Sequence, residues 1–489
     1  MNILMVASEA APLAKTGGLA DMVSGLSSAL VKLGHDVRIL VPGYAGTVEQ
    51  VAQRERVATL TVQDGASVAT VGIDRVVPKG QAVDTPPHAP TFYLVQHDGY
   101  FGRRGMYQDS GRDYPDNLAR FALFSRAALA LVRHWAAEKW SVDVIHAHDW
   151  QAALVPFYLK VGTGGASILQ NARTVLTLHN VGYQGLFPAD QYSLLGVGDG
   201  YFTPQHLEFY GQVNLLKAGI VSAGALTTVS PTYCREIQTQ EFGFGLVGVF
   251  RERREQLVGI VNGIDTELWN PETDPWLPAQ YSAENLQGKA LCKTALQREC
   301  GWEASRQPLF AVVSRLVSQK GIDLLVAAVP KLVADGGQLV ALGSGDADLV
   351  EALRQLERRF PQSVKAFIGF DEGLAHRIQA GADAFLVPSR YEPCGLTQLC
   401  SLRYGTVPIV RNTGGLADTV RDSSTASPDR PATGFVFDRA DSADLSAAMS
   451  RALLVYQDQR QWTQLVLNGM REPVGWDQSA KAYADVYTN

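Results

Sequence analysis

The stretch "KTGGLADMVSGL" (15–26) shares its letters TGGLAD with a second stretch, "RNTGGLADTVRD" (411–422). Each copy follows a short apolar run, "ILMVA" before the first and "VPIV" before the second. After the first copy, apolar residues from Leu19 to Leu30 recur at helical spacing. Both copies therefore predict a strand, a glycine turn and a helix, the repeating unit of a doubly wound α/β domain.

Short apolar, β-branched runs alternate with helical patterns along the rest of the chain, which predicts parallel sheets covered on both faces. The expected strands of the first half are Ile3–Ala7, Val37–Val41, Phe92–Val95, Val142–His146, Thr174–Leu178 and Leu226–Val229. Those of the second half are Leu309–Val313, Gln338–Leu342, Val364–Ile368, Ala384–Val387, Val407–Val410 and Gly434–Phe437. Two sets of strands predict two Rossmann-like domains.

The boundary between these domains is expected after VNGID (261–265), because NPETDPWLP (270–278) has three prolines and no periodicity. The expected domains are residues 1–262 and 263–465. Binding sites of such sheets form outside the carboxyl ends of the strands. Two facing sheets would hold a ligand in the cleft between them.

Composition limits the classes of function. The net charge is −6 without a run of Lys or Arg, which argues against binding nucleic acid through its phosphates. Five cysteines without CxxC spacing are typical of a reduced, intracellular protein without a zinc site. The N-terminus has no basic signal-peptide region, and no stretch reaches the ~20 apolar residues of a membrane helix. We expect a soluble cytoplasmic protein with no membrane partner.

The glycine pairs of the two TGGLAD copies suit an anion or a sugar, because they allow close backbone approach at the start of a helix. Lys15 adds a cation beside Gly17 and Gly18. A plain strand-to-helix turn remains the alternative for either copy, including Gly414 and Gly415.

Two segments at strand ends of the second half add charge. In SRLVSQKGID (314–323), Arg315 and Lys320 are typical of a diphosphate clamp, with a solvated charged turn as the alternative. In PSRYEPCGLTQLCSL (388–402), Glu392 could accept sugar hydroxyls and needs a polar partner if it is buried. The backbone N–H groups of Gly395, Leu396 and Thr397 would point at a phosphate. Cys394 has no histidine nearby in sequence, so packing is its expected role.

Two segments of the first half carry histidines and an aspartate. In VIHAHDWQA (144–152) and LTLHNVGYQG (176–185), Asp149 and His179 end adjacent expected strands. His179 could bond a sugar hydroxyl or simply be a buried, satisfied histidine. His146 and His148 are expected to be one packed and one loop histidine rather than metal ligands, because no further ligands are visible.

Together these segments resemble the bacterial glycogen synthase family of glycosyltransferases, which includes the plant starch synthases. The resemblance runs nearly end to end and includes KTGGLAD, HAHDW, TLHN, NGID, SRL..QKG, EPCGLTQL, the second TGGLAD and GWDQSAKAY. It implies a GT-B fold, two doubly wound Rossmann-like domains facing each other across a deep cleft, with a C-terminal helix (466–489) packing back on the first domain.

The resemblance also implies site residues. The family's ADP-glucose-binding lysine falls on Lys15, and its essential arginine, lysine and glutamate fall on Arg315, Lys320 and Glu392. Its active-site histidine and aspartate fall on His179 and Asp149, and Asp21 and Asn262 match further cleft positions. The second TGGLAD, with Thr413, faces the same cleft near the sugar and diphosphate. Tyr107 is expected near the acceptor path.

The implied activity is transfer of glucose from ADP-glucose to the non-reducing end of an α-1,4-glucan, with retention and without a metal or other cofactor. UDP-glucose as donor, or a non-catalytic glucan or nucleotide-sugar binding protein, are the alternatives. A pyridoxal-dependent phosphorylase lacks its lysine motif here, and LGSGDAD (342–348) lacks the third glycine of a dehydrogenase fingerprint. Asp346 and Asp348 are expected in a loop, and 163–172 is expected to be a peripheral expanded loop.

Overall fold

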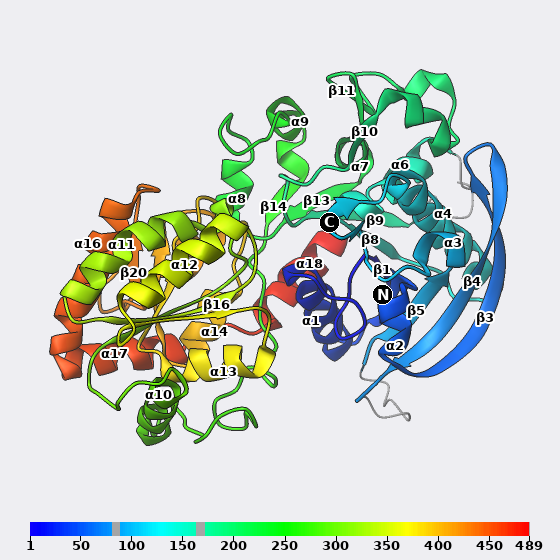
Figure 1. Ribbon diagram of the computed structural model, residues 1–489. Coiled ribbons are helices and arrows are strands. Elements are labelled where there is room, and N and C mark those ends of the chain that lie inside the picture. Colours follow the sequence, from blue (N-terminus) through cyan, green and yellow to red (C-terminus); the bar gives the residue numbers. More distant parts are fainter. Residues whose placement is uncertain (81–88, 163–171, 489) are drawn as a thin grey trace. The chain divides into compact units, whose positions relative to one another are not determined.

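The chain forms two compact units in the computed structural model, which describes residues 1–80, 89–162 and 172–488 (Figure 1). Unit 1 comprises Met1–Val229, Cys234–Asn262 and the C-terminal segment from Trp476. Unit 2 comprises Ser230–Tyr233 and Gly263–Gly475. The chain passes into unit 2 after Asn262, the last residue of the expected first domain. Within the described ranges, no helix has both the length and the apolar character that crossing a membrane requires.

Unit 1 is built on a nine-stranded sheet that is parallel except at one edge. The strands in spatial order are β14 (Leu257–Gly259), β13 (Ala225–Thr228), β9 (Arg173–Leu178), β8 (Val144–His148), β1 (Asn2–Val6), β2 (Asp36–Pro42), β5 (Thr91–Gln96), β4 (Ser67–Pro78) and β3 (Val51–Asp64). The long antiparallel hairpin β3–β4 at the edge (Figure 1) was not expected from the sequence. Most β3 side chains are exposed, so the strand has no continuous apolar run to reveal it.

Unit 2 is built on a six-stranded sheet in which every pairing is parallel. Its order is β17 (Val364–Ile368), β16 (Gln338–Gly343), β15 (Leu309–Val313), β18 (Ala384–Val387), β19 (Val407–Arg411) and β20 (Phe435–Phe437). These strands confirm the six expected from the sequence, with small differences at their ends. Because all strands run the same way, their carboxyl ends lie at one edge of the sheet.

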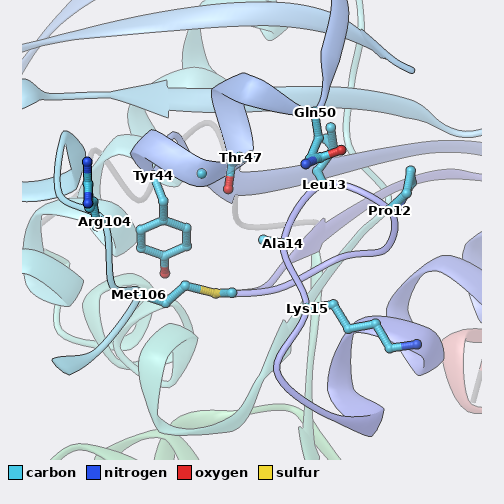
Figure 2. Close-up of a pocket in the computed structure, with 10 residues that line it drawn as sticks. Pro12, Leu13, Ala14, Lys15, Tyr44, Thr47, Gln50, Arg104 and Met106 are labelled. Atoms are coloured by element: carbon cyan, nitrogen blue, oxygen red, sulfur yellow. The ribbon is translucent and has the colours of Figure 1, made fainter. Parts of the chain in front are cut away.

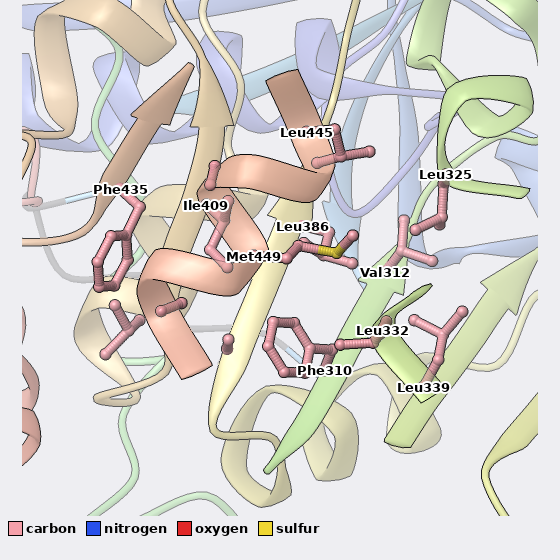
Figure 3. Packing of buried hydrophobic residues seen from close by; sticks show 14 of the residues in the cluster. Phe310, Val312, Leu325, Leu332, Leu339, Leu386, Ile409, Phe435, Leu445 and Met449 are labelled. Carbon is pink, nitrogen blue, oxygen red and sulfur yellow. The ribbon is translucent and has the colours of Figure 1, made fainter. Parts of the chain in front are cut away.

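Alternation along β15 explains why this strand is apolar throughout. Phe310 and Val312 pack on one face, in a core shared with helices α11 (Ile322–Ala334) and α16 (Ser442–Gln457) (Figure 3). Leu309 and Ala311 point to the opposite face, into a second core. A strand covered on both faces needs an apolar residue at every position, so its sequence is a continuous run.

The end of the chain returns to unit 1 as helix α18 (Asp477–Thr488), which packs on α1 (Gly18–Lys32). A Cβ at Gly25 would lie 2.1 Å from the indole Nε1 of Trp476, so only glycine leaves room for this ring. The expected boundary at 466 falls inside α17 (Gln459–Met470), which remains in unit 2 because its apolar face, including Val466, belongs to that core.

Candidate functional site

The first TGGLAD copy places an open helix start at the carboxyl end of β1. Gly17 is the N-cap of the fifteen-residue helix α1; among the described residues no side chain caps it, and apart from its chain neighbours no atom lies within 4 Å of a Cβ placed there. Gly17 and Gly18 are exposed. The ammonium of Lys15 lies 2.7 Å from Asp21 Oδ1, and both side chains are partly exposed. This turn therefore offers free backbone N–H groups and a lysine to an approaching anion.

A buried glutamate that the sequence analysis did not single out holds this loop. Glu9 Oε2 accepts the backbone N–H of Thr16 at 2.5 Å, and Oε1 accepts the Thr16 hydroxyl at 2.7 Å. The hydroxyl of Tyr107 donates to Oε1 at 2.6 Å and lies 2.8 Å from Ser8 Oγ. Tyr107 thus supports the loop that carries Lys15. The signal available in the sequence was a charged residue three positions after the apolar strand β1.

A pocket of about 280 Å³ lies beside Lys15 (Figure 2). Its lining residues are Pro12, Leu13, Ala14, Lys15, Tyr44, Gly46, Thr47, Gln50, Arg104 and Met106. The side chains of Thr47, Gln50 and Arg104 form no hydrogen bond or ion pair to any described residue. The pocket therefore combines apolar walls with uncommitted polar groups, a composition that suits a sugar ring.

Asp149 and His179 end the neighbouring strands β8 and β9, as the sequence predicted. Oδ1 of Asp149 accepts the backbone N–H of His179 at 2.7 Å, and the N–H of Asn180 also bonds this carboxylate. Burial raises the pKa of Asp149 to about 7 and lowers the pKa of the His179 imidazole to about 3. Asp149 has φ 53°, a left-handed conformation that aspartate and asparagine tolerate better than most residues. Asn262, the last residue of unit 1 before the chain enters unit 2, is buried, and its Oδ1 has no partner among the described residues.

The expected division of the HxH pair into one packed and one loop histidine is wrong. β8 extends to His148, two positions beyond the expected end at His146, and both histidines are fully buried. Residues i and i+2 of a strand share one face, so the two rings lie on the same side of the sheet. Among the described residues, no cluster of His, Cys, Asp and Glu is arranged to hold a metal ion.

In unit 2, an ion pair joins two segments singled out from the sequence. Lys320 Nζ lies 2.5 Å from Glu392 Oε2, and Ser389 Oγ donates to the same oxygen at 2.8 Å. Glu392 is buried, so this lysine and this serine supply the polar partners that a buried carboxylate requires. Its Oε1 has no hydrogen bond to any described residue and remains available to a ligand.

Arg315 and Phe370 are exposed at the same edge of the unit 2 sheet. Arg315 follows β15, and its guanidinium forms no ion pair or hydrogen bond within the described ranges. Phe370 follows β17 and is 88% exposed, which the sequence analysis missed. An arginine without an ion-pair partner in the described residues and an exposed aromatic ring, both at the carboxyl ends of parallel strands, are features that a bound nucleotide would cover.

The glycines of the second TGGLAD approach protein backbone, unlike those of the first copy. A Cβ at Gly414 would lie 1.9 Å from the carbonyl oxygen of Glu392, and one at Gly415 would lie 2.2 Å from that of Cys394. The N–H of Gly415 donates to the Glu392 carbonyl at 3.1 Å. Thr413 and both glycines are buried. The second copy therefore packs against the backbone of residues 392–394 and holds it in place. The two TGGLAD turns are similar in local structure but differ in what their glycines contact.

The remaining predicted positions differ in exposure. Gly395, with φ 73°, Leu396 and Thr397 are partly exposed at the start of the short helix α14 (Thr397–Arg403). Cys394 is buried, in agreement with a packing role.

Asp346 lies outside a helix or strand, as expected, but Asp348 does not lie in the expected loop. Asp346 is the N-cap of α12 (Ala347–Arg359) and Asp348 is in its first turn, where carboxylates favour the helix dipole. The predicted expansion at 163–172 lies outside the described residues apart from Ala172.

Comparisons with known proteins agree with this architecture. A family model described as "Starch synthase catalytic domain" matches residues 2–252, and one described as "Glycosyl transferases group 1" matches residues 297–465. A glycogen synthase of Anaeromyxobacter sp. is 47% identical over 489 residues, covering 100% of this chain and 99% of that protein. One from Syntrophotalea carbinolica is 44% identical, with 100% and 98% covered. The chain belongs to the bacterial glycogen synthase and plant starch synthase family.

Solved structures of this family and fold support the same assignment. The catalytic domain of starch synthase IV from Arabidopsis thaliana, bound to ADP and acarbose, has a TM-score of 0.89 and 35% identity, covering 99% of this chain and 98% of that one. Sucrose-phosphate synthase from Thermosynechococcus elongatus has a TM-score of 0.59 at 18% identity, with 100% and 98% covered, and shows the fold alone. The predicted GT-B fold, with two Rossmann-like sheets, is confirmed.

Proposed function

We propose that the protein transfers glucose from ADP-glucose to the non-reducing end of an α-1,4-glucan, with retention of the anomeric configuration. The observation that carries this proposal is the group formed by Lys320, Glu392 and the uncommitted Arg315 at the binding edge of unit 2. The family assignment and the ADP bound to the Arabidopsis starch synthase support the nucleotide sugar as donor.

The charges suit departure of a nucleoside diphosphate. When the anomeric C–O bond breaks, negative charge grows on the β-phosphate and positive character grows on the sugar. Arg315 and Lys320 would bind the leaving diphosphate more strongly in the transition state than in the ground state, which is the condition for raising kcat. The free Oε1 of Glu392 would accept hydroxyls of the donor glucose. With two cations for this task, the proposed reaction uses no metal ion.

Unit 1 would supply the remaining contacts. Lys15 and the open start of α1 offer a cation and N–H groups to the same donor, and we assign Asp21 to orient Lys15 through their ion pair. The close contact between Asp149 and the His179 backbone fixes His179, whose ring we assign to the donor glucose. The alternative of a non-catalytic binding protein would not need this combination of charges.

A labelling assay tests the proposal. Purified protein is incubated with glycogen and either ADP-[¹⁴C]glucose or UDP-[¹⁴C]glucose, and the product is digested with an enzyme specific for terminal α-1,4 linkages. We expect label from ADP-glucose that this digestion releases. Label from UDP-glucose alone would change the assigned donor, and no incorporation from either would overturn the proposed activity.

The ionisation of Asp149 gives the first prediction. Because burial raises its pKa to about 7, the carboxylate forms as the pH rises through 7, and we expect kcat/KM to rise with it. The Asp149→Asn variant keeps an oxygen for the His179 N–H and tolerates φ 53°. It should lose this step in the pH profile, whereas a variant that retains the step would remove Asp149 as its cause.

The same substitution has a stability signature with a defined sign. The unfolded carboxyl ionises near 3.8 and the folded one near 7, so the stability that the protonated group contributes is present in full below pH 3.8 and is lost progressively as the pH rises to 7. Asp149→Asn avoids burying the charge. Its free energy of unfolding relative to wild type should therefore increase between pH 5 and pH 7 and level off above pH 7, as measured in urea.

The pocket beside Lys15 gives a prediction for the acceptor. We assign it to a glucose unit of the glucan, held against Tyr44 and Met106 with hydrogen bonds from Gln50 and Arg104. Replacing Gln50 or Arg104 by alanine should raise KM for glycogen about fivefold, the equivalent of one hydrogen bond, and leave the Kd for ADP unchanged. An unchanged KM for glycogen in the double variant would exclude this assignment.

Phe370 gives a prediction for the donor base. An aromatic ring exposed at the nucleotide-binding edge can stack on adenine, a contact worth about 1–3 kcal/mol. Phe370→Ala should weaken ADP binding in calorimetry by about tenfold or more and leave the KM for glycogen unaffected. Phe370→Tyr, which keeps the ring, is the matched control, and equal ADP affinity in all three proteins would refute stacking.

A further inference from the structure

The HxH pair of β8, which the proposed chemistry does not use, contacts the C-terminal helix of the same unit. The Tyr487 hydroxyl of α18 lies 2.7 Å from Nδ1 of His146. Nε2 of His146 lies 2.6 Å from Thr177 Oγ1, which lies 2.6 Å from Thr227 Oγ1. These four side chains come from α18, β8, β9 and β13 and are all buried, so both nitrogens of the His146 ring are held in place.

His148 continues this series toward the proposed catalytic histidine. Its ring packs on His146 with centroids 4.2 Å apart and planes inclined by 31°. Nδ1 of His148 lies 3.2 Å from Nε2 of His179. The other nitrogen of His148, Nε2, is buried without a hydrogen-bond partner in the described part of the chain. The orientation of His148 therefore depends on its stack with His146 and its bond to His179.

Both histidine rings of this network are neutral. Burial lowers the pKa of His146 to about 3 and that of His148 well below its usual range, so each ring has one donor and one acceptor nitrogen. Burial raises the pKa of the Tyr487 phenol, which stays protonated and can donate to Nδ1 of His146 or accept from Nδ1–H. Nε2 of His146 then donates to the Thr177 hydroxyl or accepts from it, so both ring nitrogens are bonded in either tautomer. The phenol therefore helps to fix the rotation of the His146 ring.

We propose that Tyr487 is a positioning residue for His179, acting through the stacked pair His146 and His148. The residues at the two ends of the first contact are 341 positions apart in sequence, so the C-terminal helix would have a part in activity as well as in packing. This inference rests on the proposed role of His179 in holding the donor glucose.

The test compares Tyr487→Phe with Tyr483→Phe. Tyr483 lies one turn earlier on the same helix, and its ring centroid is 5.6 Å from that of His146. Tyr487→Phe retains the ring and removes the hydroxyl. We expect kcat to fall about fivefold, the equivalent of one hydrogen bond, with KM for donor and acceptor unchanged. The histidine ¹⁵N NMR shifts should also move in Tyr487→Phe, whereas Tyr483→Phe should retain both wild-type properties.

A second variant keeps the inference testable if Tyr487→Phe is poorly folded. His148→Gln should lower kcat to a similar extent. The double variant Tyr487→Phe/His148→Gln should have a kcat no lower than that of the less active single variant, because both substitutions act through the orientation of the His179 ring. Equal losses in the two tyrosine variants, or a wild-type kcat and unchanged ¹⁵N shifts in Tyr487→Phe, would overturn the inference.

The proposed role of His179 is tested separately. His179→Asn with a wild-type kcat would remove that role, and the ¹⁵N shifts of His148 would still report whether Tyr487 controls the ring orientation. Loss of activity in His179→Asn together with wild-type activity in Tyr487→Phe would support the role of His179 but exclude Tyr487 as its positioning residue.

Discussion

Replacing Lys320 by methionine is expected to lower both activity and stability. The ammonium is proposed to stabilise the leaving diphosphate, and loss of one such contact typically lowers kcat by about 10²–10³. The same ammonium is 2.5 Å from the buried carboxylate of Glu392. Removing one partner of a buried ion pair typically costs about 3–5 kcal/mol of stability. Steady-state kinetics and urea unfolding measure the two effects.

A double variant separates these two losses. Adding Glu392→Gln to Lys320→Met removes the unpaired carboxylate, while Ser389 can still bond the amide oxygen. The free energy of unfolding should therefore return toward the wild-type value, and kcat should remain low. If stability is not recovered, the ion pair is not the source of the loss. If kcat recovers, Lys320 has no role in the reaction beyond neutralising Glu392.

Replacing Arg315 by glutamine should lower activity strongly but, unlike Lys320→Met, should leave the stability almost unchanged. Its guanidinium is exposed and forms no hydrogen bond or ion pair within the described ranges, so the free energy of unfolding should stay within about 0.5 kcal/mol of wild type. The proposed contact with the diphosphate predicts that kcat falls by about 10²–10³.

Arg354→Gln, on the exposed surface of α12, is the matched control for loss of a positive charge. It should have wild-type kinetics. A similar loss of kcat in both variants would indicate a general effect of net charge, and a wild-type kcat in Arg315→Gln would remove the arginine from the mechanism.

The sequence predicted the parts of the fold whose signal is local. Strands such as β15 are covered on both faces and read as continuous apolar runs, so their positions were found. The hairpin β3–β4 has many exposed side chains and was missed. β8 was placed two residues early, and one of the two histidines of the HxH pair was expected in a loop.

The sequence indicated candidate site residues, but it did not indicate the partners that the structure gives them. Lys320 and Glu392 were both expected near a phosphate, yet their ion pair joins positions 72 apart. Glu9 and Tyr487 act through contacts 98 and 341 positions away, for which the sequence has no periodic signal. The repeated TGGLAD predicted two similar turns correctly. Which turn is open to solvent depends on the packing of Gly414 against Glu392, a tertiary contact.

The proposed function assigns both Lys15 and Arg315 to binding of the nucleotide sugar. Titration calorimetry with ADP measures this directly in wild type, Lys15→Gln, Arg315→Gln and the double variant. Each single substitution is expected to weaken ADP binding by about tenfold or more, and the double variant is expected to bind weakest. Wild-type affinity for ADP in either single variant would contradict this assignment.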